Sequence, residues 1–176
     1  SNLSGHNGQY GGYGSAESGY LFYRISPFAD AIHTAVAPIL AKITPDMSDR
    51  QIIELCVRET VARIDYEVSG GASWANGKPT GDCESYARMI QQLLAMADIP
   101  VIYMTGTTGL GPHAWLQVGI REGDDITGQI VDGTATEVGH NAILSYAEHQ
   151  SYMNYDGKIN HHDVYAVAKA LISAAY

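Results

Sequence analysis

The sequence is poor in several residue types, and each scarcity excludes a class of protein. Cysteine occurs twice in 176 residues, too rarely for a small domain held together by disulfides. Lysine and arginine number 10 against 19 aspartates and glutamates, a net charge of -9, and they form no cluster that could bind nucleic acid. No apolar run approaches the length of a membrane span, so we expect a soluble protein.

The length fits one compact domain with some peripheral extension. Residues 1–24 contain a glycine-, tyrosine- and serine-rich stretch without hydrophobic periodicity, which predicts a flexible tail, and residues 25–176 are expected to form the domain. Twelve tyrosines against two phenylalanines favour a surface that contacts peptides or sugars. Because the first residue is also not methionine, we expect a processed protein, secreted or at the cell surface, with the cytoplasm as the alternative.

One of the two cysteines, Cys83, is predicted to begin a helix. The residues before it, 77–81, are poor in regular-structure formers, and residues 86–96 after it are apolar at helical spacing. A helix start exposes a sulfur atom to backbone N–H groups and to the positive end of the helix dipole, which favours the thiolate and offers donors for an oxyanion. The alternative is a small apolar residue that packs the helix start.

Two segments further along the chain could supply the base and the orienting group that a cysteine nucleophile needs. Residues 114–120 and 127–131 are short apolar-rich runs on either side of Gly123, which predicts a β-hairpin. The first run follows His113 and the second precedes Asp132. Each residue alone also fits a simpler role, His113 at a strand start and Asp132 in a turn.

The pairing within this hairpin depends on which residues form its turn. If Glu122 and Gly123 are the central turn residues, His113 lies directly opposite Asp132, with both side chains on one face of the sheet. A turn centred on residues 124 and 125 would change that pairing. With the first register, the chain order cysteine, histidine, aspartate predicts a catalytic triad.

Taken together, these segments resemble the transglutaminase-like superfamily of papain-type cysteine enzymes. The resemblance spans about residues 46 to 135 and is carried by five short stretches: Gly81-Asp82-Cys83, Tyr86-Ala87, Ile99-Pro100, His113-Ala114-Trp115 and Val131-Asp132-Gly133-Thr134. It implies that Cys83 is the nucleophile, His113 the base and then the acid, and Asp132 the orienting residue. The expected fold is α+β with a papain-like or transglutaminase-like core, in which helices pack on one side of a small antiparallel sheet.

The resemblance also implies a side chain upstream of the cysteine that stabilises an oxyanion. Trp74 and Tyr66 are the candidates, and the sequence does not choose between them. Packing in the core is the alternative role for each.

Catalytic members of the superfamily transfer acyl groups through a thioester intermediate. We therefore predict a cysteine-dependent hydrolase of peptide or other amide bonds, whose partner is a peptide or protein substrate, cell-wall material included. The alternatives are a transglutaminase or acyltransferase with the same triad, and a non-catalytic relative that binds peptides or glycans. Hydrolysis is favoured because nothing in the sequence marks a site for a second substrate.

No cofactor and no required metal are expected. The adjacent residues of His161-His162-Asp163 lack a companion at a metal-ligand spacing, and Asp124-Asp125 lack further spaced oxygen ligands for calcium. Cys56 falls on the apolar face of a helix predicted over residues 49–64, so it belongs in the core, and a disulfide with Cys83 is not expected. Further helices are predicted over residues 28–43 with a break near Pro38, over 142–152, and over 164–174, the last as a helix or as a strand followed by a helix.

Overall fold

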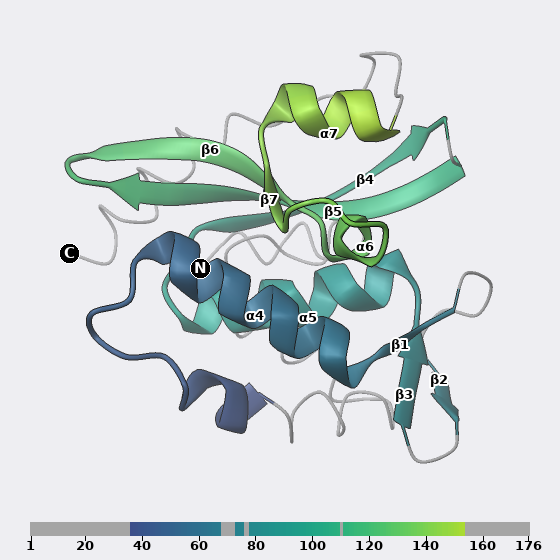
Figure 1. Cartoon of the computed structure of the whole chain (residues 1–176), viewed down its shortest axis with the longest axis horizontal. Coiled ribbons are helices and arrows are strands. Elements are labelled where there is room, and N and C mark those ends of the chain that lie inside the picture. Colours follow the sequence, from purple (N-terminus) through teal and green to yellow (C-terminus); the bar gives the residue numbers. More distant parts are fainter. Residues whose placement is uncertain (1–35, 68–72, 76–77, 110, 154–176) are drawn as a thin grey trace, which may run out of the picture.

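A computed structural model describes residues 36–67, 73–75, 78–109 and 111–153, with the backbone alone for 73–75 and 78–80 (Figure 1). The expected tail, the first half of the predicted helix over 28–43 and the segment after residue 153 lie outside the described residues. In the described half, residues 36–40 are helical through Pro38, so the break expected near Pro38 is not seen there. Within them the fold is α+β, with helices packed on a four-stranded antiparallel sheet. In the part of the chain that the structure describes, no helix is long and apolar enough to cross a membrane.

The main sheet is formed by four strands that are neighbours in the order β4-β5-β6-β7. Every pairing in it is antiparallel. Its members are β4 (Val101–Thr108), β5 (Gly111–Glu122), β6 (Asp125–Val131) and β7 (Ile143–Leu144). The long central strand β5 carries His113 near its start, and β6 ends one residue before Asp132.

The hairpin between β5 and β6 turns one residue later than the first of the two predicted turns. Glu122 pairs with Asp125, so Gly123 and Asp124 are the central turn residues. Gly123 has a φ of 63°, and Asp124 is not among the residues with positive φ, as a type II′ turn requires. Glycine takes the first turn position because it adopts this φ without a steric penalty.

This turn shifts the predicted register by two residues. Leu116 pairs with Val131, and the pairing of β5 with β6 ends there. The expectation that His113 lies directly opposite Asp132 is therefore wrong. A shift by an even number of residues keeps side chains on the same face, so both residues still belong to one side of the sheet.

Helices cover both faces of the sheet, so the expectation of helices on one side only is wrong. The helices α4 (Asp49–Arg63) and α5 (Cys83–Met96) pack on one face, and α7 (Tyr146–Met153) lies on the other (Figure 1). Residues 114–120 of β5 are all buried, so side chains on both faces of the strand are removed from water. The predicted helix over 142–152 starts later because Ile143–Leu144 form β7.

The helix α4 is capped and fastened to the sheet. Ser48 and Gln51 form a capping box at its start. The Asp49 carboxylate accepts three hydrogen bonds from Arg121 on β5, one from its backbone N–H and two from its guanidinium. Cys56, in the middle of α4, is fully buried as predicted, and both cysteines are free.

A second, three-stranded sheet leads the chain into α5. It contains β1 (Asp65–Tyr66), β2 (Ser73–Ala75) and β3 (Lys78–Gly81) in the order β1-β3-β2. The strand β3 ends one residue before Asp82, and α5 begins at Cys83. This sheet thereby sets where α5 starts, next to the main sheet.

Candidate active site

Cys83 is the first residue of α5, as the sequence predicts, and is partly exposed. The preceding residue, Asp82, caps the helix: its Oδ1 accepts hydrogen bonds from the backbone N–H groups of Glu84 at 3.0 Å and Ser85 at 3.3 Å. Two of the N–H groups expected to face the sulfur are therefore already paired. The N–H of Cys83 itself belongs to the first turn, where α-helical bonding supplies no partner.

Asp132 also caps a helix, the short α6 (Gly133–Glu137). Its Oδ1 accepts from the backbone N–H groups of Thr134 at 3.0 Å and Ala135 at 3.4 Å. Its other oxygen, Oδ2, lies 2.8 Å from Nε2 of His113. The cap fixes the carboxylate, and the carboxylate fixes the His113 ring with its Nε2 atom toward Asp132.

Gly133 allows α6 to lie against α5. A Cβ atom at this position would lie 3.1 Å from Cδ1 of Ile90 and 3.4 Å from the Tyr86 side chain, both on α5. Tyr86 in turn donates a hydrogen bond of 2.6 Å to Glu137 at the end of α6. The close approach brings Asp132 toward the start of α5, where Cys83 lies.

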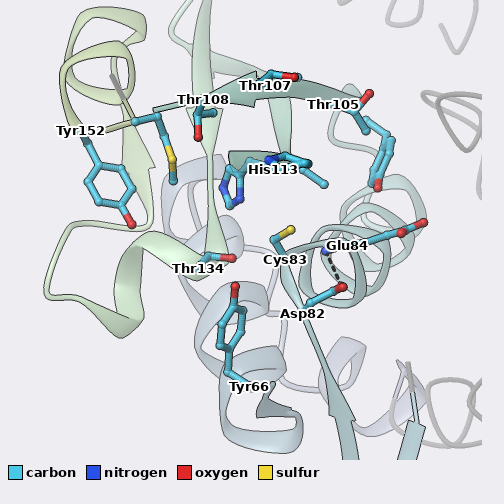
Figure 2. A pocket seen from close by; sticks show the side chains of 15 residues that line it. Tyr66, Asp82, Cys83, Glu84, Thr105, Thr107, Thr108, His113, Thr134 and Tyr152 are labelled. Carbon is cyan, nitrogen blue, oxygen red and sulfur yellow. Dashed lines mark hydrogen bonds between the residues drawn. The ribbon is translucent and has the colours of Figure 1, made fainter. Parts of the chain in front are cut away.

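Cys83 and His113 line one cavity of about 700 Å³ (Figure 2). Figure 2 shows the cysteine side chain beside the histidine ring, with Thr134 to the left of Cys83 and Tyr66 below. Cys83 is not one of the three grouped residues His113, Asp132 and His149, but it adjoins that group through a hydrogen bond with His113. The structure thus brings the three predicted residues into one region.

The hydrogen bonds of this region control its charges. Burial lowers the pKa of His113, but the hydrogen bonds with Asp132 and Cys83 outweigh it and raise the pKa to about 9. Burial raises the pKa of Asp132, and the hydrogen bonds from His113 and His149 outweigh it and lower the pKa to about 2. The site therefore favours a charged imidazolium beside a carboxylate at neutral pH.

The structure describes the side chain of only one of the two oxyanion candidates, Tyr66. Tyr66 lines the same cavity as Cys83, and its hydroxyl points toward Thr134 and the cysteine (Figure 2). Burial, and then the negative charge on Cys83, raise the pKa of Tyr66, so its hydroxyl keeps the proton that a donor needs. Trp74 lies in β2, where its backbone is opposite Pro79, and its side chain is outside the described part of the chain.

His149 is the member of the site that the sequence did not reveal. Its Nε2 lies 2.9 Å from Oδ2 of Asp132, the oxygen that also binds His113, and its side chain is fully buried. The stretch from Ser145 to Glu148 has the spacing of a capping box and marks the start of α7. It could have located the helix, but no local pattern connects His149 with Asp132.

Among the described residues, one group of side chains could hold a metal ion: His113, Asp132 and His149. One possible ligand atom from each of them lies within 4.8 Å of the others. However, both imidazole Nε2 atoms lie at hydrogen-bond distance from one carboxylate oxygen. A metal ion at this point would have to displace both protons and separate the three groups. The geometry favours a hydrogen-bonded cluster. The predicted loop at His161-His162-Asp163 lies outside the described residues.

Comparison with known proteins adds no assignment. No protein-family model matches the chain, and no curated protein matches it. What the chain itself offers toward a function is the geometry of the site and the short stretches of sequence that build it.

Proposed function

We propose that the protein is a cysteine-dependent hydrolase of the transglutaminase-like type, which cleaves peptide or other amide bonds through a thioester. The observation that carries this proposal is that Cys83 and His113 line one cavity while His113 is hydrogen-bonded to Asp132. A thiol next to an imidazole, and a carboxylate that holds the imidazole, are the groups that catalysis by a cysteine nucleophile requires.

In the proposed reaction the Cys83 thiolate attacks the carbonyl carbon of the amide. Because Nε2 of His113 is held by Asp132, the other ring nitrogen, Nδ1, is the one that exchanges a proton with the sulfur and the substrate. The imidazolium gives its proton to the leaving amine as the C–N bond breaks, which leaves a thioester. Water then attacks the thioester, passes a proton to His113 and releases the acid and the thiolate.

The tetrahedral intermediates of both steps carry an oxyanion that needs hydrogen-bond donors. The backbone N–H of Cys83 is one candidate, because the two N–H groups that follow it are bound by Asp82. The Tyr66 hydroxyl is the second, since it lines the cavity and points toward the cysteine (Figure 2). The two donors come from different elements, so the oxyanion would lie between them.

The proposal is tested by substrate screening with matched variants. The native chain, Cys83→Ala and His113→Ala are each incubated with a library of peptides and small amides, and products are identified by mass spectrometry. We expect amide cleavage by the native protein alone, with the melting temperature of Cys83→Ala close to native. Cleavage at native rates by Cys83→Ala would overturn the assignment of the nucleophile.

A further inference from the structure

We propose that His149 is a positioning residue of this site, which holds the Asp132 carboxylate in the orientation and ionisation state that His113 requires. The inference rests on the proposed function, since it assigns a partner to the orienting residue of the triad. It starts from one contact: the Nε2 atoms of His113 and His149 lie 2.8 Å and 2.9 Å from the same oxygen, Oδ2 of Asp132.

The Asp132 carboxylate is fully engaged by these bonds. Oδ1 accepts two backbone N–H groups at the start of α6, and Oδ2 accepts the two imidazoles. Asp132 is 1% exposed and His149 is 0% exposed, so bulk water cannot replace the hydrogen bond between them. A buried carboxylate with four donors has little freedom to rotate and remains ionised. Without His149, the side of Oδ2 away from His113 would be open.

The helix that carries His149 is held at both ends. At its start, the backbone N–H of Ser145 donates to Glu148 and the N–H of Glu148 donates to Ser145 Oγ. At its end, the backbone N–H of Gly109 donates to the carbonyl of Met153. The His149 ring itself lies 5.1 Å from the Trp115 ring on β5, which limits how it can turn. Nε2 of His149 is therefore presented to Asp132 by a fixed support.

Two tyrosines are also titratable and lie near Asp132, but among the described residues neither is hydrogen-bonded to its carboxylate. Burial raises the pKa of Tyr66, at the end of β1, and of Tyr152, on α7, and the charge of Asp132 adds to the increase in each. Both are neutral phenols at physiological pH, so they add no charge of their own. The two histidines are thus the groups that determine how Asp132 ionises.

Loss of the hydrogen bond from His149 should change the pKa of Asp132 in a predictable direction. Burial raises the pKa of Asp132 and the two imidazole bonds lower it, so removing one of them raises it. As pH falls, Asp132 would then be protonated at a higher pH than in the native protein, and the carboxylate that holds the His113 imidazolium beside Cys83 would lose its charge at that pH. The acidic limit of Cys83 reactivity should move to higher pH by about one unit, the scale of a hydrogen bond to a charged group.

The experiment compares two replacements of His149. In His149→Gln an amide N–H can take the place of Nε2–H, whereas His149→Phe keeps a ring and removes the donor. Leu144→Ala is the control, because Leu144 packs in the same apolar cluster as Trp115 without bonding to Asp132. The measurement is the rate of iodoacetamide labelling of Cys83 from about pH 2 to about pH 9, the pKa values of Asp132 and His113, followed by peptide mass spectrometry.

We expect the acidic limit of labelling to rise in His149→Phe and to stay near native in His149→Gln and Leu144→Ala, with turnover about tenfold lower in the Phe variant alone. An unchanged limit in His149→Phe would make His149 a packing residue and overturn the inference, while the native profile would still support the triad. A native protein whose Cys83 reacts no faster than a free thiol at acidic pH would instead overturn the proposed function.

A second measurement covers the case in which His149→Phe does not fold. In native protein labelled with ¹⁵N-histidine, two Nε2-bound protons should appear as separate downfield signals with slow exchange. His149→Gln should remove one signal and keep the other. If the native protein shows only one such proton, His149 does not donate to Asp132 and the inference fails.

Discussion

Asp82 and Asp132 cap two different helices in the same way. Each accepts backbone N–H groups two and three residues later through Oδ1, at 3.0 Å and 3.3 Å for Asp82 and at 3.0 Å and 3.4 Å for Asp132. They differ in the second oxygen, because Oδ2 of Asp132 binds His113 and His149. One cap sets the position of Cys83 and the other, through Asp132, sets the position of His113, so local helix-capping chemistry builds both halves of the proposed site.

The two cysteines should differ strongly in reactivity. Cys83 is partly exposed at a helix start beside His113, whereas Cys56 is fully buried, and burial followed by the nearby Glu59 charge raises its pKa to about 12. Brief alkylation at pH 7 with peptide mapping should therefore label Cys83 first. The matched control is His113→Ala, in which labelling of Cys83 should slow and labelling of Cys56 should not. Faster labelling of Cys56 would contradict the assignment.

Stability should depend on pH through the pair of Asp132 and His113. The folded pKa of Asp132 is about 2 against 3.8 for the free group, so its contribution is present above pH 3.8 and is lost as pH falls toward 2. The folded pKa of His113 is about 9 against 6.5, so its contribution is present below pH 6.5 and is lost as pH rises through 9. Each contribution is on the order of 3 kcal/mol at most.

The measurement is the melting temperature across this range. We expect a maximum between pH 3.8 and 6.5 with declines on both sides, and a flatter curve for Asp132→Asn, which keeps the volume of the side chain but not its charge. The same variant should retain a low residual rate, because the orienting partner is weakened and not removed. A native-like pH profile in Asp132→Asn would show that other groups control the stability.

The sequence predicts the parts of this site that depend on local signals. A helix start at Cys83 follows from the glycine-rich stretch before it and the apolar period after it, and α5 does begin there. The stretch itself is expected to lack regular structure, but residues 78–81 form β3 because they pair with β1 and β2. The hairpin register was harder, because Gly123 fits either position of a two-residue turn and the choice moves the pairing by two residues. His149 lies 17 residues beyond Asp132 and reaches it only because α7 folds over the second face of the sheet. Neither the hydrophobic periodicity nor the spacing of residues in the sequence indicates that contact.

The contact between α6 and α5 offers a prediction about packing. In Gly133→Ala the new Cβ atom would meet Cδ1 of Ile90 at 3.1 Å, so α6 must move away from α5 and Asp132 with it. We expect a loss of about 1 to 3 kcal/mol in the free energy of unfolding, measured by urea titration, and a lower turnover. The double variant with Ile90→Val lacks the contacting Cδ1 atom, so it should recover much of the turnover. Equal loss in the single and double variants would place the cause elsewhere.

The type of reaction can be decided by competition for the acyl-enzyme. A transferase must keep an amine near the thioester and exclude water, which requires a second approach to the site and closure over it. Cys83 lines an open cavity together with Thr105, Gly106 and Thr107, and the described residues around it include no additional domain that would cover the thioester. Water should therefore reach the intermediate directly.

We accordingly expect the free acid to be the main product even when a primary amine is added at a concentration of roughly the millimolar range typical of a weak second substrate. The products of the native protein with a cleavable amide are quantified by mass spectrometry with and without the amine, and Cys83→Ala serves as the blank for uncatalysed exchange. The amine-free reaction fixes the rate of hydrolysis, so a true acceptor site would appear as a saturable rise in adduct at the expense of acid. Mainly amine adduct with little free acid would replace the hydrolase by a transferase that uses the same Cys83, His113 and Asp132.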